Sequence, residues 1–135
     1  MSIFDIFVKR KPLSAPWAKY YTKEDLNYVI PDITMYDQVK KSYQEYPKNV
    51  AISYMGKKIK YNKLIKIIDT VSRGFYDMGI RKGDIVTILL PNVPEALFSL
   101  YALNKIGAIA NMTHPLSAEE EIKETLISTK SKYLI

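Results

Sequence analysis

The chain has 135 residues, of which 47% are hydrophobic and 25% are charged, a balance typical of one globular domain or a piece of one. It contains no cysteine, which excludes disulfide bonds and thiolate metal sites, and its single histidine, His114, excludes a histidine-rich metal cluster. The formal net charge of +6 raises the question of an anionic partner.

The N-terminal stretch, MSIFDIFVKRK, does not have the pattern of a secretory signal. Its apolar part is short, is interrupted by Asp5 and precedes the basic residues, whereas a signal peptide has the opposite order. No apolar run approaches the roughly 20 residues that a membrane-spanning helix needs. We therefore expect a cytoplasmic protein. Residues 1–33 are rich in aromatic side chains without helical or strand periodicity, which predicts an extended N-terminal arm that lies on a folded body.

The arm is followed by a predicted helix and hairpin. Thr34 and Asp37 have the spacing of a helix N-cap and its partner, and Pro47 ends that helix. Residues 50–54 and 58–61 then predict the two strands of a β-hairpin, with the turn at 55–57.

The next helix begins at a predicted cap, Asn62. Its apolar residues recur at steps of four and three, the pattern of a helix that packs on a sheet. They are Leu64, Ile68, Val71, Phe75 and Met78.

From residue 85 onward, strands and helices alternate. Residues 85–90 and 108–112 predict buried strands, separated by a helix that Asn92 caps and Gly107 ends. Ser117, with Glu120 three residues on, predicts the cap of a third helix, and residues 132–135 predict another strand. The order from residue 49 is hairpin, helix, strand, helix, strand, helix, strand. This alternation favours the α/β class, with a mostly parallel sheet, flanking helices and right-handed crossovers.

The densest basic segment carries Lys57, Lys58, Lys60, Lys63 and Lys66. Such a run can bind nucleic acid or an anionic membrane, but it is more often a solvated face. The chain has no arginine-rich segment, aromatic stacking motif or zinc-finger spacing, so we expect no nucleic-acid partner. Peripheral membrane contact stays open as an alternative.

Gly79 and Gly83 raise the question of a phosphate-binding loop. A P-loop needs G-x-x-x-x-G-K-[ST] between a strand and a helix, whereas these glycines are four apart and lie between a helix and a strand. Asp84 follows directly, and its carboxylate would repel a phosphate. The pair therefore indicates a helix C-cap followed by a tight turn.

Two further positions could carry chemistry because they follow predicted strands. The corner LLPNVPEA precedes a helix N-terminus, where an anion can bind. Its Asn92 and Glu95 are expected to cap the helix, however, and Pro94 has no amide hydrogen. His114 lies in the turn NMTHPL, with no carboxylate or hydroxyl partner assignable from the sequence. We therefore assign no catalytic, cofactor-binding or metal-binding residue.

Four segments resemble the adenylate-forming (AMP-binding) superfamily, which includes acyl-CoA synthetases, luciferases and peptide-synthetase adenylation domains. They are IKYNKL at 59–64, GIRKGDIVTILLPNVPEA at 79–96, LNKIGAIANMTHPL at 103–116 and SAEEEIKETLISTKSKYLI at 117–135. The arm segment APWAKYY is similar to long-chain fatty acyl-CoA ligases in particular. Lys60 and Lys63 stand where the first motif usually has Thr and Glu.

The resemblance implies a parent enzyme that converts a carboxylic acid and ATP to an acyl-adenylate and then transfers the acyl group to coenzyme A, with Mg²⁺. The family's Ser/Thr/Gly-rich phosphate loop, its later nucleotide motifs and its C-terminal lysine do not occur here. We therefore expect an arm, 1–33, and an incomplete N-terminal α/β subdomain, 34–135, which is not catalytic alone and binds no cofactor.

The expected partners are the remainder of the ligase chain and, in the parent, a small carboxylic acid; a homo-oligomer stays open. An alternative is a free-standing interaction module of the same fold. The open apolar strand at 132–135 argues against this alternative, because an unpaired edge promotes aggregation. A third hypothesis, an electrostatic nucleic-acid or membrane binder, depends on net charge alone.

Overall fold

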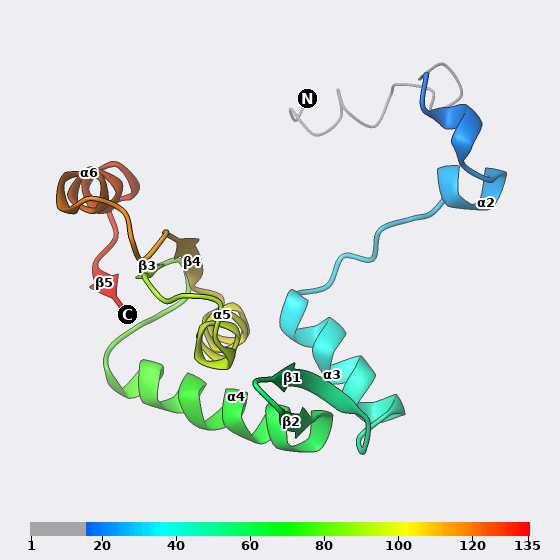
Figure 1. Ribbon diagram of the computed structural model, residues 1–135, viewed down its shortest axis with the longest axis horizontal. Helices are drawn as coiled ribbons and strands as arrows, with labels where there is room; N and C mark the ends of the chain where they lie inside the picture. The colour runs from blue at the N-terminus through cyan, green and yellow to red at the C-terminus, as the bar shows by residue number, and fades with distance from the viewer. Residues whose placement is uncertain (1–15) are drawn as a thin grey trace. The chain divides into compact units, whose positions relative to one another are not determined.

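The computed structural model describes residues 16–135, which divide into a unit that ends at Asp32 and a unit over 33–135 (Figure 1). In the first unit, the 3₁₀ helix η2 (Ala18–Tyr20) is followed by the short helix α2 (Lys23–Leu26). The expectation of an extended arm is therefore wrong for this stretch. Helix α2 forms because of a capping box that the sequence analysis missed. Thr22 Oγ1 accepts from the amide of Asp25, and the Asp25 carboxylate accepts from the Thr22 amide. The expectation that the arm lies on the body stays a prediction.

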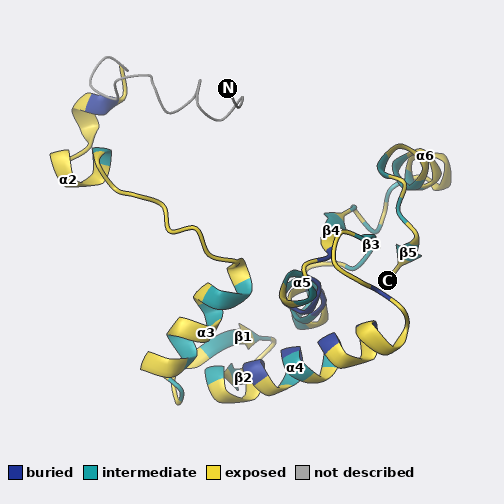
Figure 2. Ribbon diagram, turned by 180° about the vertical axis from the view of Figure 1, so that it is seen from behind, coloured by how far each residue is buried: buried dark blue, intermediate teal, exposed yellow. Residues whose placement is uncertain are grey.

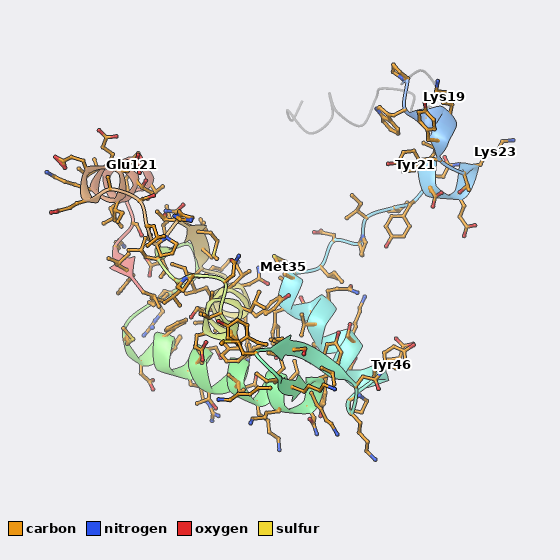
Figure 3. All side chains as sticks on the ribbon, viewed as in Figure 1. Lys19, Tyr21, Lys23, Met35, Tyr46 and Glu121 are labelled. Atoms are coloured by element: carbon orange, nitrogen blue, oxygen red, sulfur yellow. The ribbon has the colours of Figure 1, made fainter. Side chains whose placement is uncertain are left out.

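The second unit begins with α3 (Met35–Glu45), whose predicted cap is confirmed. Thr34 Oγ1 accepts from the Asp37 amide at 3.0 Å, and the Asp37 carboxylate accepts from the Thr34 amide at 3.2 Å. Met35 and Tyr46, labelled in Figure 3, mark the two ends of this helix. The hairpin follows as β1 (Val50–Tyr54) and β2 (Lys57–Lys60), paired antiparallel as expected.

Helix α4 (Tyr61–Asp77) presents most of its predicted apolar stripe to the core. Leu64, Ile68 and Phe75 are buried, whereas Met78 lies at the C-cap and is exposed. The expectation for Met78 is wrong because the helix ends before the stripe completes its next turn. The cap is also misplaced: Lys60, not Asn62, is the N-cap, and its side chain makes no capping bond.

The parallel sheet has the order β4-β3-β5. Its strands are β3 (Ile85–Ile88), β4 (Ile109–Met112) and β5 (Tyr133–Leu134). Both neighbours pair with β3 in parallel, which confirms the α/β class and the crossover connections; that the crossovers are right-handed stays a prediction. The connecting helices are α5 (Pro94–Ile106) and α6 (Glu119–Thr129). Figure 1 shows them on opposite sides of the sheet.

The core lies between the sheet and the layer of α4 and α5. Val86 and Ile88 of β3 are fully buried there and pack with Ile68 of α4 and Leu103 of α5. The buried positions of α5 also include small residues, Ala96, Ser99 and Ala102, which let two helices approach closely. Helix α6 has no buried residue, and Figure 2 shows it with intermediate and exposed positions alone.

The predicted caps of the last two helices are wrong by one residue each. Val93 rather than Asn92 is the N-cap of α5, with Pro94 at the first helical position, where a missing amide hydrogen costs nothing. Ala118 rather than Ser117 is the N-cap of α6. Gly107 ends α5 in the left-handed conformation, with φ of +83°, as the sequence predicts.

Candidate functional site

The carboxyl ends of β3 and β4 form the edge of the parallel sheet at which α/β proteins usually bind ligands. The chain leaves β3 through Leu90, Pro91 and Asn92 and leaves β4 through the segment 113–116. These two segments line an open hollow of about 560 Å³, together with Met112. The corner and the histidine turn that the sequence analysis considered separately thus lie on one hollow.

His114 contributes a fixed but exposed imidazole to this hollow. Its Nδ1 accepts a hydrogen bond from the Leu116 amide at 3.2 Å, and its carbonyl oxygen accepts from the Ser117 amide at 3.1 Å. Nδ1 is therefore occupied in holding the turn, and Nε2 is the nitrogen left to face solvent or a ligand. No carboxylate of the described residues contacts the ring, so nothing orients it as a general base.

Asn92 lines the same hollow, at the entrance to α5. Since Val93 takes the cap position without a side-chain bond, the Asn92 amide is exposed and makes no side-chain hydrogen bond with any described residue. The expectation that Asn92 and Glu95 are committed to capping is therefore wrong. The reason is local backbone geometry: the Val93 amide donates to the Pro91 carbonyl at 2.7 Å, and this tight turn shifts the helix start by one residue.

The chemistry of the hollow is mostly apolar. Leu90, Pro91, Met112, Pro115 and Leu116 make up most of its wall. It has no lysine, arginine or carboxylate, and the described residues contain no group of three or more potential metal ligands. The residues present therefore do not fit a nucleotide triphosphate with its magnesium ion. The hollow suits contact with an apolar or aromatic group.

The glycine turn lies at the opposite, amino end of β3, away from this hollow. Gly79 and Gly83 have positive φ angles of +94° and +86°, and the Gly83 amide donates to the Gly107 carbonyl at 2.9 Å. Asp84 accepts from the Arg81 amide at 2.8 Å and pairs with Lys132 Nζ at 3.0 Å. These internal bonds confirm the predicted helix end and strand entrance.

A buried polar chain across the sheet was missed by the sequence analysis. Thr87 of β3 is fully buried, accepts from Asn111 Nδ2 at 3.1 Å and donates to Ser131 Oγ at 2.9 Å. Ser131 Oγ in turn donates to backbone carbonyls of residues 85 and 133, both at 3.1 Å. The one signal in the sequence is that Thr87 is the sole polar residue of its strand. This series of hydrogen bonds joins β4, β3 and the start of β5, so its role is to hold the register of the sheet.

Residues 39–135 match the family described as "AMP-binding enzyme". The chain belongs to this family. The match covers the hairpin, the sheet and the hollow, so these elements are the family's scaffold. No described helix is long and apolar enough to cross a membrane.

Curated relatives in the same family include several acid–CoA ligases. The chain is 27% identical over 121 residues to a long-chain-fatty-acid–CoA ligase of Bacillus subtilis, an overlap of 89% of this chain and 22% of that protein. It is 36% identical over 80 residues to 4-coumarate–CoA ligase 3 of Arabidopsis thaliana, which covers 59% of this chain and 14% of the relative. The acetyl-coenzyme A synthetase of Bartonella quintana is 35% identical over 82 residues, or 61% of this chain and 13% of the relative. The chain thus spans about a fifth or less of the length of these relatives.

Solved structures give the same result. The N-terminal subdomain of Klebsiella oxytoca NpsA superposes with a TM-score of 0.73 at 30% identity, covering 76% of this chain and 27% of that one. O-succinylbenzoate coenzyme A synthetase of Bacillus subtilis, solved in complex with AMP, has a TM-score of 0.71 at 20% identity. The superposition covers 76% of this chain and 26% of that one, and this likeness shows the fold alone. The expected fold, part of the N-terminal domain of the acyl-CoA synthetase-like class, is confirmed.

Proposed function

We propose that this chain is the N-terminal scaffold portion of an ATP-dependent acyl-CoA ligase and is not catalytic alone. The observation that carries the proposal is the chemistry of the carboxyl-edge hollow. The hollow belongs to a family scaffold, yet it offers no cation for phosphates and no base oriented toward a substrate. The remainder of a ligase chain would supply these groups, and the chain spans 22% of the Bacillus subtilis relative's length.

The parent reaction has two steps. A carboxylate and ATP give an acyl-adenylate and pyrophosphate, and the acyl group then passes to the thiol of coenzyme A with release of AMP. ATP, Mg²⁺ and coenzyme A belong to the parent in this proposal, as does a cytoplasmic location. The described residues of this chain contribute the sheet, the apolar wall of the hollow and the turn that His114 holds.

A long-chain fatty acid or another apolar acid is the proposed substrate. Two observations support this choice. The similarity to the fatty-acid ligase extends over 121 residues, whereas the similarities to the coumarate and acetate enzymes cover 80 and 82 residues. The hollow is lined mainly by apolar side chains, which match an acyl chain better than a small polar acid.

The experiment has two parts. First, the coding sequence beyond codon 135 is determined, and the encoded protein is assayed for pyrophosphate release with palmitate, coumarate and acetate as acids. We expect the largest rate with palmitate. Second, the 135-residue chain is assayed alone with palmitate, ATP and Mg²⁺, and we expect no release above background. Palmitate-dependent release by this chain alone would contradict the proposal, as would a longer protein that activates none of the acids.

The alternative is a free-standing interaction module of the same fold. Its supporting observation is that the described residues hold no catalytic constellation. A stop codon directly after codon 135 would favour this alternative over the ligase, and binding rather than turnover would then be the property to assay.

A further inference from the structure

The positive charge of the chain is concentrated in one segment. Residues 47–68 contain six lysines, no arginine and no acidic residue, so this segment alone carries as much charge as the whole chain's net +6. The five lysines over 57–66 are exposed, and none forms an ion pair with a described residue. Lysines that are not paired with acidic side chains create a positive electrostatic potential around this segment.

The turn of the same hairpin breaks a local rule of backbone geometry. Tyr54 pairs with Lys57, so Met55 and Gly56 form a two-residue loop, and both have positive φ angles, +45° and +78°. This is the geometry of a type I′ turn, in which Asn-Gly is the favoured pair and a methionine in the first position is strained. The Met55 side chain is 85% exposed, so contacts with the described residues do little to offset the strain.

The lysines flank this apolar tip and continue along α4. Lys57, Lys58 and Lys63 line a hollow of about 470 Å³ whose wall also includes Ile59, Phe98 and one acidic residue, Glu95. Lys63 also lines the adjacent hollow together with Lys66, Ile67 and Val71. The face therefore alternates flexible cations with apolar side chains along its length. Lysine side chains can lay their methylene stems on such apolar surface while their ammonium groups reach outward.

We propose that this hairpin face, defined as Met55 with Lys57, Lys58, Lys63 and Lys66, docks on an anionic lipid bilayer. The lysines are attracted to the lipid phosphates, and the Met55 side chain enters the layer between the headgroups. The bilayer explains the exposed tip. An apolar side chain on a strained turn lowers the free energy only where it leaves water for an apolar environment, and the bilayer provides one. The proposal does not depend on the ligase assignment, because it concerns a face distinct from the carboxyl-edge hollow.

Nucleic acid fits the same face less well. All six positive side chains of the segment are lysines, whereas arginine provides the planar, two-bond contacts typical of base and phosphate recognition. An apolar tip has no partner on a phosphate backbone. An anionic bilayer binds a surface that combines positive charge with an exposed apolar side chain, and the hairpin has both.

The test is co-sedimentation of the 135-residue chain with vesicles. We expect binding to vesicles of phosphatidylcholine and phosphatidylglycerol in equal parts and little binding to phosphatidylcholine alone. Binding is expected to fall when added salt shortens the screening length to about 3 Å. The double variant Lys57→Gln/Lys58→Gln should bind at least about fivefold more weakly, since one lysine near an anionic surface contributes a factor of that order. The matched control is Lys123→Gln/Lys130→Gln, which removes the same charge from exposed positions at α6 and should bind as the unaltered chain does.

Met55→Asn distinguishes the effect of the apolar tip on vesicle binding from any effect on stability of the fold. Asparagine accepts the left-handed conformation, so the variant should be at least as resistant to heat as the unaltered chain while its vesicle binding falls severalfold. Equal binding by Met55→Asn would overturn the insertion of the tip. Equal losses in both lysine pairs, or binding to heparin without binding to vesicles, would overturn the bilayer as the occupant.

Discussion

Lys105 Nζ lies 2.6 Å from Oδ1 of Asp69, and this ion pair joins α5 to α4. Tyr36 of α3 extends the contact: its hydroxyl donates to the same carboxylate at 3.2 Å, and its backbone amide donates to Asn104 Oδ1 at 2.8 Å. Lys105 Nζ also lies 5.2 Å from the centre of the Tyr36 ring. Three helices are thus held together by one carboxylate and its neighbours.

We expect Asp69→Asn to lower the free energy of unfolding by about 0.5–1 kcal/mol, measured by urea denaturation. The value is modest because the two side chains are 33% and 38% exposed, and solvent screens the pair. Glu120→Gln is the control, since it removes a looser pair with Lys123, 3.7 Å long and more exposed. A change as large for Glu120→Gln as for Asp69→Asn would contradict the role of the three-helix contact.

Thr87→Val should be the more damaging substitution, although it preserves the shape of the side chain. It leaves Asn111 Nδ2 with only the longer bond to Thr113 Oγ1, at 3.4 Å, and removes the donor to Ser131 Oγ, which keeps its bonds to backbone carbonyls. Loss of the partner of a buried polar group costs about 1–3 kcal/mol. Ser128→Ala removes an exposed hydroxyl that bonds within α6 and should change stability by less than about 0.5 kcal/mol. Equal unfolding midpoints for Thr87→Val and the unaltered chain would show that the polar chain does not hold the register.

The start of α6 offers a stabilising substitution. The Ala118 amide donates to the carboxylate of Glu121, labelled in Figure 3, at 3.2 Å, but alanine has no oxygen to accept in return. Ala118→Ser would complete the capping box and should raise the free energy of unfolding by about 1 kcal/mol. Ser117→Ala should have little effect on helix content, because Ser117 lies outside the helix. A loss of helicity by circular dichroism in Ser117→Ala would restore Ser117 as the cap.

Asp84 should make the fold sensitive to acid. The Arg81 amide, first, and the Lys132 ammonium stabilise its charged form, which lowers the pKa of Asp84 below its ordinary value of 3.8. The folded state then binds this proton less readily than the unfolded state. The contribution to stability is therefore complete above the ordinary pKa and is lost as the pH falls through the lowered value.

The measurement compares Asp84→Asn with the unaltered chain by urea denaturation along a pH series. The difference in unfolding free energy between the two should be constant near neutral pH and should shrink below about pH 4. Glu124→Gln, which removes an exposed acid without an ion pair among the described residues, is the control. A difference that does not change with pH would show that the Asp84 charge has no part in stability.

Periodicity and alternation predicted the elements of the second unit and their order, because apolar spacing is a local property of the sequence. The single-residue errors lie at helix starts. Asn92 and Ser117 have better capping side chains than Val93 and Ala118, yet tight turns that start at Pro91 and His114 decide where each helix begins. Such turns depend on backbone hydrogen bonds that propensities do not describe.

The candidate site was predictable in its parts but not as a whole. Asn92 and His114 were each recognised as residues that follow a strand, and their position on one hollow follows from the pairing of β3 with β4. The Thr87 chain was not predictable, since Asn111 and Ser131 become its partners only when three strands are in register. Met55 was assigned to a turn, but its strained φ angle is a property of the folded hairpin.

The central position of β3 also affects the order in which the sheet forms. Of the three strands of the parallel sheet, β3 is synthesised first, and α5 and β4 can then fold back on it as one compact crossover. The other edge of β3 receives its partner only when Tyr133, which pairs with Val86, has been synthesised. Until then the strand with the most deeply buried side chains exposes a row of free peptide groups, and long-range parallel pairing is slow. The edge of β3 that faces β5 is therefore the last part of the sheet to be paired, and β5 is the element that pairs it.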